Sequence, residues 1–145
     1  MTLVDANVLL HAVNVTSPQH RAAKAWLDDA LSGDERVGLP WLSLLAFVRL
    51  ATHPAVFPSP LAIDQALGVV RAWCARPSVV HPEPSSGFVD SFGHALESAR
   101  AHSGLVTDAY LAALANEYGA RVVTFDRDFA RFDGVETVRP AGRGG

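Results

Sequence analysis

Three aspartates stand in short motifs whose residue types could do chemistry on a phosphate ester. Asp5 ends the run T-L-V-D, Asp108 lies in L-V-T-D-A-Y, and Asp126 lies in V-V-T-F-D-R-D-F. Carboxylate oxygens without an accompanying His or Cys cluster suit Mg²⁺ or Mn²⁺ better than Zn²⁺. Such an ion can activate water and stabilise the oxygens of an in-line displacement at phosphorus. We therefore expect a metal-dependent enzyme that acts on phosphate esters.

The elements predicted around these acids would bring them together although they are far apart in the sequence. Apolar runs at 2–4 and 121–125 read as strands that end at Asp5 and Asp126, and Asp108 opens an apolar helix that Thr107 would cap. Further strands are expected at 36–39, 79–81 and 135–138, between helices at 6–13, 41–52 and 88–102 and helices that start at Ser17-Pro18 and Ser59-Pro60. This alternation predicts an α/β sandwich with a parallel sheet, in which residues after the carboxyl ends of strands share one crevice.

Composition places the chain in a broad class. With 145 residues, 49% apolar and 19% charged, it is predicted to be a globular domain over residues 1–140, followed by a disordered tail at 141–145. No apolar run approaches the roughly 20 residues that span a bilayer. A single cysteine, Cys74, excludes an internal disulfide and favours a cytoplasmic location. The net charge of −3 does not exclude nucleic acid, because metal would neutralise several acids.

Each acid also has a structural interpretation. Asp5 could cap the helix after it, and Asp108 could be stabilised by a helix dipole alone. Asp126 and Asp128 are two carboxylates after a buried strand, which favours a functional role. Asp128 is expected either as an acid supporting the metal ligands or as the cap of a turn at 129–132.

Neighbouring polar residues are candidates for support. Asn7 and Thr124 could orient the acids from behind, and Thr107 could do the same beside Asp108. Arg127 and Arg131 flank the expected site and could contact phosphate, although surface charge is the default interpretation.

With these motifs in place, the sequence resembles the PIN-domain ribonucleases, in particular the VapC-type toxins of bacterial toxin–antitoxin pairs. The most specific part is L-V-T-D-A-Y-L-A-A-L-A-N-E-Y-G-A-R-V-V-T-F-D-R-D-F. The resemblance implies a three-layer α/β/α sandwich with a central parallel sheet, Mg²⁺- or Mn²⁺-dependent hydrolysis of RNA, a cognate antitoxin and a homodimer. It also implies that Asp5, Asp108 and Asp126 bind metal, with Asp128 in support.

The sequence departs from the family pattern in the helix expected at 41–52. A glutamate is usual there, and the matching position is Ala46; no acid occurs from 39 to 54. We expect one well-held metal ion, with a second arriving with the substrate. The helix is nearly all apolar, so we expect it to contribute to a dimer or antitoxin surface through Leu44 and Phe47, and Arg49 is its candidate RNA contact.

Two other functions remain open from the residues. One is a Mg²⁺-dependent phosphatase or phosphotransferase with Asp5 as the nucleophile. The other is a PIN-like module that binds RNA but has lost activity together with the glutamate.

Overall fold

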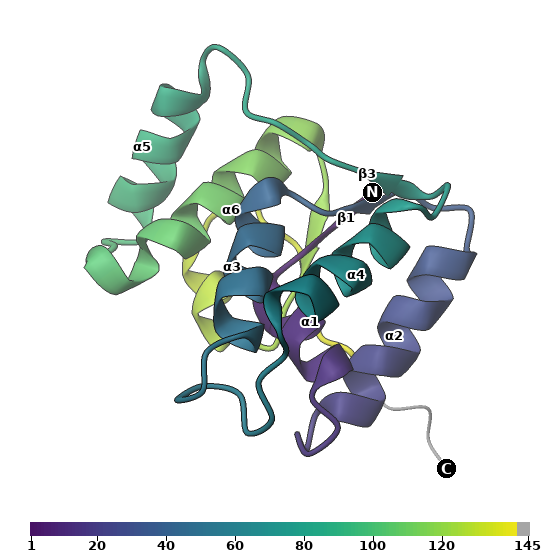
Figure 1. Cartoon of the computed structure of the whole chain (residues 1–145). Coiled ribbons are helices and arrows are strands. Elements are labelled where there is room, and N and C mark those ends of the chain that lie inside the picture. Colours follow the sequence, from purple (N-terminus) through teal and green to yellow (C-terminus); the bar gives the residue numbers. More distant parts are fainter. Residues whose placement is uncertain (142–145) are drawn as a thin grey trace.

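The computed structural model describes residues 1–141, and its centre is a five-stranded sheet with the strand order β3-β2-β1-β4-β5 (Figure 1). All four strand pairs are parallel, with Thr2 opposite both Val37 and Arg121. The strands are β1 (Thr2–Val4), β2 (Val37–Gly38), β3 (Val79–Val80), β4 (Arg121–Val123) and β5 (Thr137–Val138). The predicted parallel α/β architecture is therefore confirmed.

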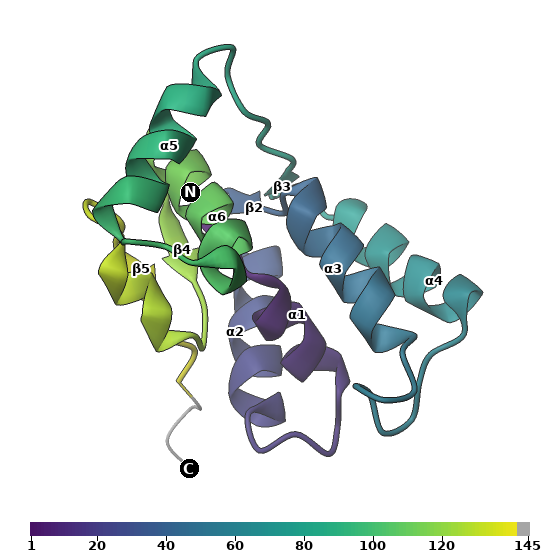
Figure 2. The same ribbon diagram turned by 90° about the vertical axis from the view of Figure 1, so that its left-hand side faces the viewer.

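Over residues 1–141, six α-helices and two short 3₁₀ helices cover this sheet. They are α1 (Ala6–Val13), α2 (His20–Ser32), α3 (Trp41–Ala51), α4 (Ile63–Cys74), α5 (Phe88–Ser98), η1 (Ser103–Leu105), α6 (Val106–Tyr118) and η2 (Arg127–Arg131). Helices α1 and α2, α3 and α4, and α5 and α6 pack as pairs of chain neighbours (Figure 2).

Two apolar cores lie on the two faces of the sheet. Successive strand residues point to opposite faces, so Val4 and Val123 belong to one core and Leu3 and Val122 to the other. The first core is completed by α1 to α4, and the second by α5, α6 and η2. This arrangement is the expected three-layer α/β/α sandwich, and it holds the carboxyl ends of β1 and β4 side by side.

Several helix boundaries differ from the predicted ones. Helix α2 begins at His20, because the Ser17 hydroxyl accepts the Gln19 N–H in a turn before the helix rather than capping it. Helix α4 begins at Ile63, where the Gln65 side chain accepts the backbone N–H of Ala62.

Two further differences concern the segment before the site. Helix α5 ends at Ser98, ahead of the predicted 102, and Arg100 then takes a left-handed backbone conformation with φ of 49°. Helix α6 begins at Val106 with Leu105 at the N-cap position, so the prediction that Thr107 caps this helix is wrong. Its predicted end at Gly119 is confirmed, with a left-handed φ of 59°.

The apolar helix α3 buries the residues that were expected to face a partner. Leu44 is 1% exposed and Phe47 is fully buried, so the prediction of an outward role for these two is wrong. The side chains that α3 presents to solvent are Trp41, 57% exposed, and Leu45, 67% exposed. Trp41 stacks on His81 with ring centroids 5.3 Å apart.

The predicted C-terminal disorder falls mostly outside the described residues, which end at Ala141. Pro140 is buried, so the chain remains packed up to that residue. Within residues 1–141, no helix is both long and apolar enough to cross a membrane.

Candidate functional site

Asp5 lies where β1 ends and α1 begins, next to the end of β4. Its backbone N–H donates to the Val123 carbonyl at 3.1 Å, which continues the pairing of the two strands by one residue. It occupies the N-cap position of α1, but its side chain makes no capping hydrogen bond. The backbone N–H groups of Ala6 and Asn7 nevertheless lie near the carboxylate, and they lower its pKa.

Asn7 and Thr124 orient the Asp5 carboxylate by hydrogen bonds to one of its oxygens. The Thr124 hydroxyl donates to Asp5 Oδ2 at 2.8 Å, and Asn7 Nδ2 donates to the same oxygen at 3.2 Å. Asn7 Nδ2 also reaches Thr124 Oγ1 at 3.2 Å, and Asn7 Oδ1 accepts the Phe125 N–H at 3.2 Å. Thr124 Oγ1 in turn accepts the Asp126 N–H at 2.9 Å. One network thus fixes the first and last of the candidate acids relative to each other.

Asp108 lies in the first turn of α6 and faces the other acids. Its pKa is raised to about 7, chiefly because burial disfavours the charged form, and then because Asp5 and Asp126 repel its charge. A hydrogen bond to Asp126, which only the protonated acid can donate, adds to this increase. Burial also raises the pKa of Asp5, and the hydrogen bond from Thr124 opposes that effect. The fold therefore brings Asp5, Asp108 and Asp126 close enough to interact electrostatically.

Asp126 and Asp128 have different positions in the turn after β4. Asp126 is the N-cap of η2, where its Oδ1 accepts the Asp128 N–H at 2.8 Å, so Asp128 does not cap the turn. Asp128 is exposed and faces Arg131 at 3.9 Å, and its charge contributes to the raised pKa of Asp108. It lies at the outer side of the acidic cluster.

Asp5 and Asp108 both line a cavity of about 20 Å³. Its wall includes Ser43 and Ala46 from α3 and Thr107 from α6. Ala46 therefore lines the same cavity as the two acids, at the position where the family pattern usually has a glutamate.

The chemistry of these groups fits a divalent cation. They offer hard oxygen ligands, and their mutual repulsion is of the kind that a cation relieves. Within residues 1–141, however, no three His, Cys, Asp or Glu side chains already stand close enough together to enclose an ion. The carboxylates would therefore have to move closer to one another to bind an ion.

The candidate RNA-contacting arginines all lie on the surface. Arg49 is on α3, and Arg127 and Arg131 are on η2, where Arg131 makes only a long ion pair with Asp128. Sequence reasoning missed Arg139, whose guanidinium lies 5.1 Å from the centre of the Phe125 ring and donates to the Phe125 carbonyl at 2.9 Å. Apart from its charge, nothing in the sequence marks Arg139, because the contact depends on β5 lying next to β4.

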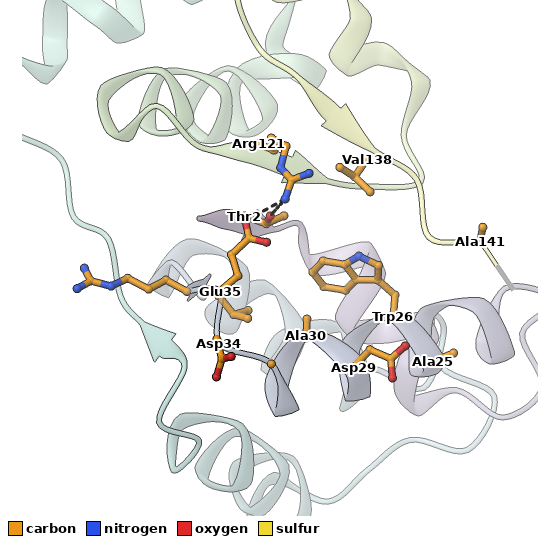
Figure 3. Close-up of a pocket in the computed structure, with 13 residues that line it drawn as sticks. Thr2, Ala25, Trp26, Asp29, Ala30, Asp34, Glu35, Arg121, Val138 and Ala141 are labelled. Carbon is orange, nitrogen blue, oxygen red and sulfur yellow. Dashed lines mark hydrogen bonds and ion pairs between the residues drawn. The ribbon is translucent and has the colours of Figure 1, made fainter. Parts of the chain in front are cut away.

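A larger cavity of about 380 Å³ lies elsewhere, between α2 and the starts of β1, β2 and β4 (Figure 3). Figure 3 shows Trp26 on one side of it and Glu35 and Arg121 on the other. Glu35 is bound by Arg121 at 2.9 Å and by the N-terminal amine at 3.4 Å. Because this carboxylate is already paired and lies at the opposite ends of the strands from Asp5, the cavity is not the candidate site.

Comparisons with known proteins agree with this fold. Residues 2–135 match the family model of the PIN domain. The chain is 49% identical over 140 residues to ribonuclease VapC37 of Mycobacterium tuberculosis, covering 97% of each chain. It superposes on VapBC2 from Rickettsia felis with a TM-score of 0.68 at 15% identity, covering 95% of this chain and 97% of the other. It superposes on VapC20 of M. tuberculosis, a sarcin-ricin loop cleaving toxin, with a TM-score of 0.61 at 20% identity, covering 94% and 99%. The chain therefore belongs to the PIN-domain family, among the VapC-type ribonucleases.

Proposed function

We propose that this protein is a divalent-metal-dependent endoribonuclease and the toxin of a toxin–antitoxin pair. The observation that carries the proposal is the convergence of Asp5, Asp108 and Asp126, with the pKa of Asp108 raised to about 7 by burial and then by the charges of the other acids. The PIN ribonucleases generally depend on divalent metals, and the oxygen ligands here favour Mg²⁺ or Mn²⁺. The identity to ribonuclease VapC37 supports RNA as the substrate.

Each residue then has a role in hydrolysis. Asp5, Asp108 and Asp126 bind the metal, and Asp128 supports them from the outer side of the cluster. Asn7 and Thr124 keep the Asp5 carboxylate oriented, and Thr107 lies beside Asp108. The bound ion would stabilise charge on the phosphate and lower the pKa of the attacking water.

The substrate backbone has to be held against this acidic cluster. The proposed phosphate contacts are Arg49, Arg127 and Arg131, since one guanidinium group can donate two parallel hydrogen bonds to phosphate oxygens. Arg139 is added to this set because its guanidinium donates to the carbonyl of Phe125, the residue before Asp126, and lies against the Phe125 ring.

The proposed partners are a cognate antitoxin and a second copy of the chain, in the cytoplasm. The similarity in fold to the VapBC2 protein supports an antitoxin. Trp41 and Leu45 on α3 are the exposed apolar side chains that we propose for contact with a partner.

RNA cleavage by the purified protein, with its antitoxin removed, tests the function. We expect cleavage with Mg²⁺ or Mn²⁺, none with EDTA, and a loss of two or more orders of magnitude for Asp5→Asn and for Asp108→Asn. Asp64→Asn is the matched control, because Asp64 also lies in the first turn of a helix but is exposed on α4. It should cleave RNA like the unmodified protein.

The same preparation separates the two alternatives. A phospho-aspartate trapped on Asp5 would indicate a phosphatase. Protein that binds RNA but never cuts it, with either ion, would indicate an inactive module, and Ala46 beside Asp5 and Asp108 is the observation that favours this second reading.

A further inference from the structure

The small cavity lined by Asp5 and Asp108 has the size of a site for one water molecule. Its volume of about 20 Å³ exceeds the ~10–15 Å³ that one water requires. A buried water also needs two to four polar partners. Here Asp5, Ser43, Thr107 and Asp108 are the polar residues of a wall whose other members are Ala6, Leu42, Ala46 and Leu111.

Ser43 is the unusual member of this wall. It is 3% exposed and lies in a helix whose other residues, Arg49 apart, are apolar. Among residues 1–141, its hydroxyl takes part in no hydrogen bond with another residue. Yet no fully buried side-chain oxygen or nitrogen in these residues lacks a partner, so the Ser43 oxygen is not fully enclosed by protein, and Ser43 lines the cavity.

Packing alone does not account for a hydroxyl at this position. A buried polar group without a hydrogen bond costs about 1–3 kcal/mol, which an alanine would avoid. Ala46, one turn further along α3, leaves the space open because its side chain is too short to fill it. A buried serine thus lines a water-sized space beside two acids.

We propose that Ser43 is a positioning residue of the metal centre, holding a water molecule between Asp5 and Asp108 as an oxygen ligand for the divalent ion. This inference rests on the proposed function, since it assumes that the two acids bind the metal. The Ser43 hydroxyl donates to or accepts from the water and so fixes where its oxygen lies. The water would supply an oxygen ligand where α3 carries Ala46 and no carboxylate.

Mn²⁺ binding to the full-length protein, measured by calorimetry, tests the inference. Ser43→Ala should raise the Mn²⁺ dissociation constant about tenfold, the lower end of the effect of removing a group that orients a ligand. Ser43→Thr keeps the hydroxyl and should restore most of the affinity. Ser98→Ala is the matched control: this serine also lies in a helix, but on α5, where it bonds only the Ala95 carbonyl.

A second measurement distinguishes a held water from a merely structural serine. The water bound to Ser43 should exchange slowly, so Ser43→Ala should increase the proton relaxivity of protein-bound Mn²⁺. Ala46→Glu would displace the water with a carboxylate, and Ser43→Ala should then change the Mn²⁺ affinity by less than about twofold, because the two sites are coupled.

The outcomes separate this inference from the proposed function. If the unmodified protein binds Mn²⁺ and cuts RNA while Ser43→Ala matches it in affinity and relaxivity, the role of Ser43 is overturned and the nuclease stands. If the unmodified protein neither binds Mn²⁺ nor cuts RNA, the proposed function fails first. A tenfold loss that Ser43→Thr restores supports the inference.

Discussion

At the scale of single residues, the site depends on side chains that orient other side chains. Thr124 is 4% exposed and makes three contacts at once, with the Asp5 carboxylate, the Asn7 amide and the backbone N–H of Asp126. Its hydroxyl thereby links Asp5, the acid after β1, to Asp126, the acid after β4. Its loss should therefore affect both acids.

Thr124→Ala should lower RNA cleavage by about 10- to 100-fold at a fixed Mn²⁺ concentration, because the ligands lose their orientation. The free energy of unfolding should fall by only about 1–2 kcal/mol, the effect of losing one or two buried hydrogen bonds. Thr124→Ser is the control, since it keeps the hydroxyl and should retain most activity. Equal cleavage by Thr124→Ala and the unmodified protein would contradict a role for this network.

The raised pKa of Asp108 predicts how stability depends on pH without metal. Its pKa is about 7 in the folded protein and 3.8 in the usual, unfolded environment. Between these values the folded state binds a proton that the unfolded state lacks, so this group makes the protein less stable as the pH rises from about 4 to about 7. In EDTA, the melting temperature relative to that of Asp108→Asn should fall as the pH rises through this range.

Metal should reverse that trend. Mn²⁺ favours the charged carboxylates, so it should raise the melting temperature of the unmodified protein more at pH 8 than at pH 5. Asp108→Asn should respond less to Mn²⁺ at pH 8. A difference in melting temperature between the two proteins that does not vary with pH in EDTA would argue against the close approach of these acids.

At the scale of elements, α3 shows what the sequence can and cannot predict. Its apolar composition predicted the helix, but not which side faces the core. Phe47 packs on Trp73 at 4.8 Å between ring centres, a contact with α4 that sequence spacing does not reveal. Leu45, only two residues earlier, lies on the open side.

Phe47→Ala should lower the free energy of unfolding by about 3–5 kcal/mol, because it leaves a cavity in the first core. Leu45→Ala should change it by no more than about 0.5 kcal/mol, since the side chain is exposed. Urea unfolding of the two variants measures both values. Similar losses in the two would show that α3 is packed differently.

The strand ends were predictable because an apolar run followed by an acid marks the end of a buried parallel strand. Asp5 and Asp126 were found in this way, Asn7 and Thr124 were chosen as their polar neighbours, and the hydrogen bonds among the four follow from the pairing of β1 with β4. The cap of α6 was not predictable, because η1 adds a turn before the helix and moves Thr107 inside it. Arg139 was missed because its partner, Phe125, is adjacent only in the folded sheet.

At the scale of the whole molecule, the order of strands determines which backbone is most protected. Strand β1 is central and is bonded on both sides, and β4 lies next to it, whereas β3 and β5 are two-residue edge strands. Local opening needs least energy where fewest contacts are lost.

Native-state hydrogen exchange should therefore be slowest at the amides of β1 and β4, such as Leu3 and Val122, and faster in β3. Addition of Mn²⁺ should slow exchange further around Asp5 and Asp126, where binding links the ends of the two strands. Slowest exchange in β3 would be inconsistent with this strand order.

The pairing of Thr2 with Arg121 also has a consequence for synthesis. During translation the first strand leaves the ribosome long before its neighbour exists, so a nascent chain carries Asp5 without Thr124 or Asp126. A cell making this protein is thus not exposed to a partly built nuclease, and prematurely terminated products that stop before residue 121 should be harmless.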